Sequence, residues 1–295
     1  MSQAGFNGAI ATALVDTRVS SQPERDDSLA QLEHLEMALA SLKQDHAELH
    51  TAIFEAAQVH RRLCAPRLIR RGDFEVASEI FAVRHLPGDF FTVYEKGSDL
   101  ILALGDIAGK GLAAGMWTTH LVGLVGAHSE TVSDPEAIVA GVNRDLCRMA
   151  LATPLASLFL ARLDPNTGRL DYCSAGHPPA MLLRANNELE LLSEGGLLLG
   201  VVATAAYTRG SVELGENDVL VVYSDGVHEA RNRAEMEFGY QRLEAQLRRS
   251  AKSTAEAVLF SVLGAVQDFA ASAPLVDDTS LVVVRRSQQR AKQLH

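Results

Sequence analysis

Five aspartates stand at the ends of predicted strands, and their side chains are of the type that binds hard divalent cations. Asp89 lies just before an apolar stretch, and Asp106 and Asp225 each follow one. Asp277 and Asp278 precede a fourth apolar stretch. A single Asp-Gly pair at a strand end is ordinary turn chemistry. Four such edges together predict one carboxylate cluster, and carboxylate oxygens are the ligands that Mg²⁺ and Mn²⁺ prefer.

The segment around the second of these aspartates, Leu100–Met116, reads LILALGDIAGKGLAAGM. It predicts a buried strand, a glycine turn and then a helix. A nucleotide-binding P-loop lies in the same kind of place, but the spacing excludes it. Only three residues separate Gly105 from Gly109, and Lys110 is followed by Gly111 and not by a hydroxyl residue. Taken alone, the segment is equally consistent with a plain turn that carries an exposed aspartate.

Five motifs follow one another along the chain: GDFF, GDIAGKG, SAGHPP, YSDGVHEARN and DDTSLVVV. In this order and at roughly this spacing they resemble the metal-dependent PPM (PP2C-like) serine/threonine phosphatases, and most closely their bacterial RsbU/SpoIIE-type branch. The resemblance covers about Phe74 to Arg285. It implies an α+β fold, an α-β-β-α sandwich of two antiparallel sheets flanked by helices and preceded by a long N-terminal helix.

The resemblance also implies a centre of two Mn²⁺ or Mg²⁺ ions that activates water for direct attack on phosphorus, with no phosphoenzyme. Asp106 falls on the position that bridges both metals, and the backbone carbonyl of Ile107 on the ligand beside it. Asp89, Asp225 and Asp277 fall on the remaining carboxylate positions. Asp89 and Asp106 are therefore the expected catalytic residues.

Three further residues are expected to support these ligands without binding metal. Asp278 takes the position after Asp277, and either carboxylate could point inward; we prefer Asp277 as the ligand. Lys110 could contact phosphate or lie in solvent. His177, in SAGHPP, could act as a general acid, but between a glycine and a proline we expect it to shape the turn.

The N-terminal part of the chain shows a second pattern, a heptad repeat. Ser28 and Gln31 form a capping-box signature at its start. The repeat places Leu32, Leu39, His46, Ile53 and His60 at one core position, and Leu35, Leu42, Leu49, Ala56 and Leu63 at the other. This seam favours a coiled coil and hence a homodimer through Leu32–Leu63. The alternative is one amphipathic helix that folds back on the phosphatase domain.

The composition changes along the chain predict four segments. Residues 1–26 are a flexible N-terminus, 27–66 a helical or coiled-coil segment, 67–287 the phosphatase domain, and 288–295 a tail. Within 67–287, short strands in hairpins alternate with pairs of helices, which predicts an antiparallel sandwich covered by helices.

The net charge of −10 argues against sequence-independent nucleic-acid binding and against anionic membranes. No apolar run reaches the roughly 18 residues that a membrane span needs. The three cysteines form no CxxC pair, and a basic signal-peptide region is missing, so we expect a cytoplasmic protein.

The family comparison makes a phosphorylated STAS-type anti-anti-sigma protein the expected substrate, in bacterial partner-switching signalling. The alternative is a catalytically weak adaptor that binds signalling partners through its coiled coil. Four clustered carboxylates favour the enzyme, because a binding module has no need of such costly like charges.

Overall fold

The computed structural model describes residues 22–63, 68–149, 154–271, 273 and 275–287. The chain divides into two units, residues 1–55 and 56–295. The flexible N-terminus and the tail predicted from sequence lie outside the described residues, apart from residues 22–26, which are helical.

Helix α2 extends over Gln22–Leu63. It begins six residues before Ser28, so the predicted capping box is wrong, because that serine lies inside the helix and not at its N-cap. In the first unit the leucines of the predicted seam are exposed, with exposed fractions of 50 to 64% for Leu32, Leu35, Leu39, Leu42 and Leu49. The coiled coil therefore stays a prediction. In the second unit, Ala57 and His60 are buried in the single chain.

The second unit contains two six-stranded sheets. The first has the order β1-β2-β12-β11-β7-β8, and the second has the order β10-β6-β5-β4-β3, with the short β9 parallel to β6. The strands of the first sheet are β1 (Leu68–Arg71), β2 (Phe74–Phe81), β12 (Thr279–Arg286), β11 (Val219–Tyr223), β7 (Ala180–Leu183) and β8 (Leu189–Leu192). Those of the second are β10 (Gly210–Glu213), β6 (Arg169–Ala175), β5 (Ala156–Leu163), β4 (Asp99–Ile107), β3 (Phe90–Lys96) and β9 (Gly195–Gly196).

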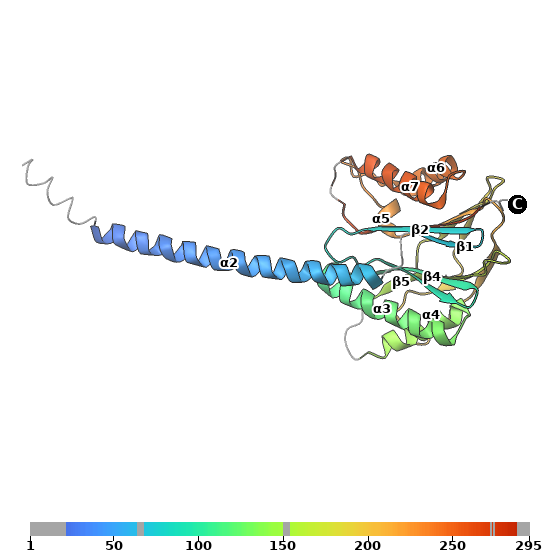
Figure 1. The fold of residues 1–295 in the computed structure, drawn as a ribbon, viewed down its shortest axis with the longest axis horizontal. Helices are drawn as coiled ribbons and strands as arrows, with labels where there is room; N and C mark the ends of the chain where they lie inside the picture. Colours follow the sequence, from blue (N-terminus) through green and yellow to red (C-terminus); the bar gives the residue numbers. More distant parts are fainter. Residues whose placement is uncertain (1–21, 64–67, 150–153, 272, 274, 288–295) are drawn as a thin grey trace, which may run out of the picture. The chain divides into compact units, whose positions relative to one another are not determined.

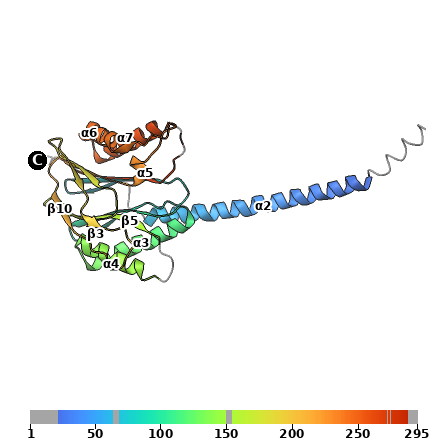
Figure 2. The same ribbon diagram turned by 180° about the vertical axis from the view of Figure 1, so that it is seen from behind.

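Helices cover the outer face of each sheet (Figure 1). Helices α6 (Gly239–Ser250) and α7 (Ala255–Ala270) lie on the first sheet, where α7 contacts β2 and β12. Helices α3 (Leu112–Thr131) and α4 (Pro135–Cys147) lie on the second, and the view from behind shows the same layers (Figure 2). The predicted α-β-β-α sandwich is confirmed. Among the described helices, none has both the length and the apolar character that crossing a membrane requires.

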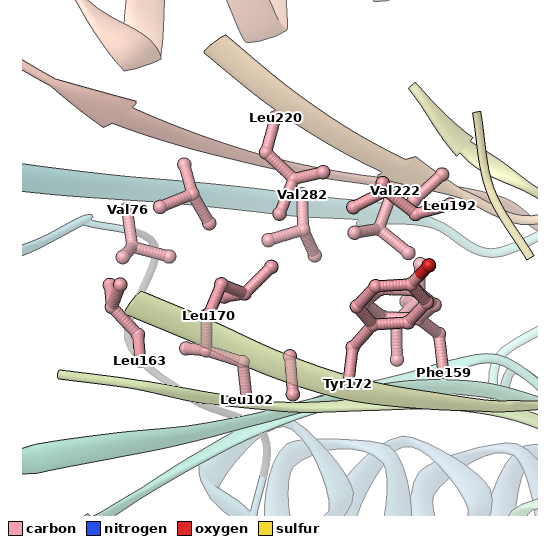
Figure 3. Packing of buried hydrophobic residues seen from close by; sticks show 14 of the residues in the cluster. Val76, Leu102, Phe159, Leu163, Leu170, Tyr172, Leu192, Leu220, Val222 and Val282 are labelled. Carbon is pink, nitrogen blue, oxygen red and sulfur yellow. The ribbon is translucent and has the colours of Figure 1, made fainter. Parts of the chain in front are cut away.

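Apolar side chains fill the space between the sheets (Figure 3). Leu102 and Leu163 of the second sheet lie opposite Leu220 and Val282 of the first, and the rings of Phe159 and Tyr172 stack with centroids 5.6 Å apart. Two further clusters join each sheet to its helices. This burial of apolar area is what stabilises the sandwich and holds the strand ends in place.

Strand β4 is longer than the sequence predicts. The expected break at Gly105 does not occur, and β4 continues to Ile107, with Asp106 paired opposite Ser157 of β5. The glycine is there because the ring of Phe90 packs against it: a Cβ at Gly105 would lie 2.5 Å from Phe90 Cε1. Strands β1 and β9 and the short helix α5 (Asp225–His228) were not predicted.

Candidate active site

The predicted carboxylates come together from both sheets. Asp89 precedes β3 and Asp106 lies near the end of β4, both in the second sheet. Asp225 opens α5 directly after β11, and Asp277 and Asp278 precede β12, both in the first sheet. Asp225, Asp277 and Asp278 each contribute to the raised pKa of Asp106, so these strand ends, far apart in sequence, bring their carboxylates close enough to interact.

The electrostatics of this cluster are those of like charges that are partly removed from water. Burial raises the pKa of Asp106 to about 6, and the Asp225 carboxylate adds to this shift. Burial, and then the charge of Asp106, raises the pKa of Asp89 well above its usual range. The pKa of Asp225 is raised by burial and by Asp277. In the metal-free protein these three carboxylates therefore keep their protons to a higher pH than free aspartates do, and a bound cation would displace those protons.

Gly88, next to Asp89, lies against a group of converging oxygens. A Cβ at this position would lie 2.9 Å from the Ile107 carbonyl oxygen and 3.2 Å from both Asp106 Oδ1 and the Gly109 carbonyl oxygen. Only a glycine leaves this space open. The predicted bridging carboxylate and the predicted carbonyl ligand thus border the same small region.

Asp278 and Ser280 hold the loop between β2 and β3 in place. Asp278 is buried, and its Oδ1 and Oδ2 accept hydrogen bonds of 2.7 Å each from the backbone N–H groups of Val83 and Gly88. Ser280 Oγ donates to Asp89 Oδ2 at 2.5 Å. Both oxygens of Asp278 are therefore engaged by backbone. The hydroxyl of Ser280 thus contacts the expected metal ligand directly.

Lys110 lies next to Asp277, one of the carboxylates that the first sheet contributes to the cluster. Its Nζ is 2.8 Å from Asp277 Oδ1 and also donates to the Val276 carbonyl. The Asp277 side chain is 46% exposed, so this ion pair is partly screened by solvent. The contact links the turn after Asp106 to the segment before β12. It also places a positive charge beside Asp277, a predicted metal ligand. The sequence alone did not predict this ion pair.

His177 is buried beside the cluster. Its Nδ1 lies 2.8 Å from Ser157 Oγ, and burial lowers the pKa of the imidazole to about 3. The ring is therefore neutral near pH 7 and has no proton of suitable acidity for a leaving group. The Ser157 contact and the lowered pKa together favour a role for His177 in shaping the turn over a role as general acid.

Two basic residues near the site were missed by sequence reasoning. His60 was assigned to the coiled-coil seam, but its buried side chain interacts with the charge of Asp278. Arg84 is exposed, and its Nη1 lies 3.6 Å from where a Cβ on Gly111 would stand. A polar residue at a heptad core position was the only available signal for His60. No local pattern marks Arg84, because its position depends on the path of the β2–β3 loop.

The donor set fits Mn²⁺ or Mg²⁺ in chemistry, since it consists of carboxylate and carbonyl oxygens. In the described conformation, however, no three His, Cys, Asp or Glu side chains of the described residues are already arranged around one metal position. Metal ligation by Asp89, Asp106, Asp225 and Asp277 stays a prediction, and binding would draw these side chains together.

The raised pKa of Asp106 gives the metal-free protein a characteristic pH dependence. An unfolded aspartate releases its proton near 3.8, whereas folded Asp106 keeps it up to about 6. The folded state binds more protons in this window, so stability should fall as pH rises through it. Mn²⁺ should therefore raise the melting temperature more at about pH 7 than at about pH 5.

Thermal melts at constant ionic strength, with and without Mn²⁺, measure this effect. Asp106→Asn is the control, and it should flatten the pH dependence of the metal-free protein. Melting temperatures that change with neither pH nor Mn²⁺ would contradict the prediction that the carboxylate cluster controls the stability of the metal-free protein.

The adjacent aspartates Asp277 and Asp278 offer a matched pair of substitutions. In Asp278→Asn the amide nitrogen must face a backbone N–H of Val83 or Gly88, so we expect a loss of about 1–3 kcal/mol in the free energy of unfolding. Asp277→Asn removes only a half-exposed ion pair and should change it by less than about 1 kcal/mol. Denaturant titration of the metal-free variants checks this, and equal effects would disprove the loop-anchoring role of Asp278.

Comparison with known proteins agrees with this architecture. Residues 96–287 match the family described as Stage II sporulation protein E (SpoIIE). The phosphoserine phosphatase RsbU of Bacillus subtilis is 25% identical over 247 residues, which cover 81% of this chain and 71% of RsbU.

Two solved structures share the fold. The SiaA-PP2C domain of Pseudomonas aeruginosa has a TM-score of 0.71 at 16% identity, over 81% of this chain and 98% of that domain. The catalytic domain of the serine/threonine protein phosphatase PstP, solved with two manganese ions, has a TM-score of 0.54 at 18% identity, over 73% of this chain and 99% of that one. The matched motifs and the sandwich lead to one conclusion: the chain belongs to the SpoIIE family of PP2C-type phosphatases.

Proposed function

We propose that this protein uses two Mn²⁺ or Mg²⁺ ions to remove phosphate from a phosphorylated serine or threonine of a protein substrate. The observation that carries the proposal is the convergence of Asp89 and Asp106 from one sheet with Asp225 and Asp277 from the other. Family membership makes the chain a PPM-type phosphatase, and the carboxylates are the residues on which such chemistry depends.

The proposed ligands are the carboxylates of Asp89, Asp106, Asp225 and Asp277 and the carbonyl of Ile107. A phosphate monoester hydrolyses extremely slowly in water, so a catalyst must supply a large stabilisation. Two divalent ions, when bound, would lower the pKa of water and neutralise phosphoryl oxygens. PstP, which has the same fold, was solved with two manganese ions.

The remaining residues of the site position these groups and add positive charge. Ser280 orients Asp89 by its hydrogen bond, and Asp278 fixes the backbone that carries it. Lys110 and the exposed Arg84 border the turn after Asp106. We infer that they favour approach of a phosphorylated segment, because cations near the site attract the phosphate dianion.

The finer part of the proposal concerns the substrate. RsbU, a relative over most of this chain, is named as a phosphoserine phosphatase. The motif resemblance to its branch supports a STAS-type anti-anti-sigma protein as the substrate, whose dephosphorylation would release a sigma factor. Such a regulator acts in the cytoplasm, and the proposal places the phosphatase there as well.

Hydrolysis assays with matched variants test the proposed function. Asp106→Asn should lower the rate on p-nitrophenyl phosphate and on phosphorylated STAS-type proteins by at least about a hundredfold at saturating Mn²⁺. Asp99→Asn, at the other end of the same strand, is the control and should leave both rates nearly unchanged. A wild-type protein with no Mn²⁺-dependent hydrolysis would favour an adaptor, and an active Asp106→Asn would refute the bridging role.

The exposed leucines of α2 support a second part of the proposal, a homodimer through Leu32–Leu63. Each seam leucine should contribute about 1 kcal/mol or more to association. Leu39→Asp combined with Leu49→Asp should therefore dissociate the dimer, whereas Ser41→Asp with Thr51→Asp, at exposed positions outside the seam, should not.

Light scattering at several concentrations measures this association, alongside both hydrolysis assays. Loss of the dimer should change the rate on the protein substrate more than the rate on the aryl phosphate, which needs only the metal centre. A wild-type protein that is monomeric at tens of micromolar would exclude the dimer.

A further inference from the structure

We propose that His177 is a positioning residue whose imidazole spans the two sheets and sets the separation between Asp106 and Asp225. This inference rests on the proposed function, because metal binding is what requires these two carboxylates at a defined distance.

His177 lies in the four-residue connection that carries the chain from β6 in the second sheet to β7 in the first. The connection is stiff. Gly176 has φ 65°, and a Cβ there would lie 2.7 Å from the Leu198 side chain, so only glycine fits. Ser174 Oγ donates to the His177 carbonyl oxygen at 3.2 Å, and two prolines follow. The backbone therefore holds the imidazole in one place.

One edge of the ring contacts the second sheet directly opposite the proposed bridging ligand. His177 Nδ1 is 2.8 Å from Ser157 Oγ. Ser157 and Asp106 are paired residues of the β5–β4 ladder, so their side chains are neighbours on the same face of the sheet. A shift of the imidazole would therefore be transmitted to the strand position that carries Asp106.

The other edge of the ring faces the first sheet. Nε2 has no hydrogen-bond partner of ordinary geometry among the described residues, while the backbone of Tyr223 and the ring of His228 both act on the imidazole. Tyr223 ends β11, and Asp225 begins α5 two residues later. His228 is itself held by Tyr240, whose hydroxyl is 3.1 Å from its Nε2 and whose ring stacks at 4.5 Å.

The neutrality of the ring suits this role. Asp106 and Asp225 repel each other in the metal-free protein, and a group that set their separation through charge would also alter their protonation. A buried, uncharged imidazole acts through contact alone. Its loss should therefore change the affinity for metal and the pre-organisation of the ligands more than it changes folding stability.

Amide variants separate the two edges of the ring. In His177→Asn the amide can reach the Nδ1 position and keep the contact with Ser157, but it cannot reach Tyr223. In His177→Gln the amide can reach the Nε2 position and loses Ser157. Ser157→Ala removes the same contact from the other side and is the mildest change. His128→Asn, whose shorter amide cannot reach the Nε2 position and so loses a 2.8 Å contact with Asp145 between α3 and α4, is the control for losing a partly buried histidine.

Calorimetric titration with Mn²⁺ and thermal melts of the metal-free proteins test the proposal. We expect His177→Asn, His177→Gln and Ser157→Ala each to raise the Kd for Mn²⁺ about tenfold. The double variant Ser157→Ala with His177→Gln should be no weaker than His177→Gln alone, because both remove one contact. His128→Asn should lower the melting temperature but leave the Kd unchanged.

The outcomes distinguish the inference from the function on which it rests. If wild type binds no Mn²⁺, the proposed function fails and the inference fails with it. If wild type binds Mn²⁺ and the Ser157 and His177 variants bind it equally well, or if their effects on Kd add in the double variant, the positioning role is wrong and the proposed function stands. Should a His177 variant fail to fold, Ser157→Ala alone decides.

Discussion

Repulsion between carboxylates at the end of the sandwich is the constraint around which the site is built. Asp89, Asp106 and Asp225 each have a raised pKa, for which burial is the largest cause and a neighbouring aspartate the next. Such a cluster does not favour folding. The proposed function accounts for the cluster, since a bound cation would turn the repulsion into attraction.

The surrounding contacts act to keep the carboxylates together against this repulsion. The apolar core between the sheets fixes the strand ends, and Asp278 anchors the β2–β3 loop through two backbone hydrogen bonds. Ser280 holds Asp89, and Lys110 partly neutralises Asp277. The polar contacts among them join segments that are far apart in sequence. The site is therefore a property of the two sheets together and belongs to neither sheet alone.

The last turns of α2 bring a different kind of residue to this region. His60 is buried in the second unit, and its pKa is lowered by burial while the Asp278 charge acts in the opposite direction. Asp278 is also the residue that anchors the loop carrying Asp89. The end of the helix therefore lies close enough for the Asp278 charge to act on the His60 imidazole.

The sequence by itself determined the family, the class of fold and the aspartates at strand ends, because motif order, strand periodicity and glycine turns are local features. Only the tertiary structure decided what surrounds them. Asp278 contacts Gly88 across 190 residues of sequence, and Ser280 contacts Asp89 across 191. The extension of β4 through Gly105 depends on the ring of Phe90, which packs against this glycine. The burial of His60 depends on packing within the second unit, which a heptad pattern does not predict. Such contacts arise when separate segments pack together, and local propensity carries no information about them.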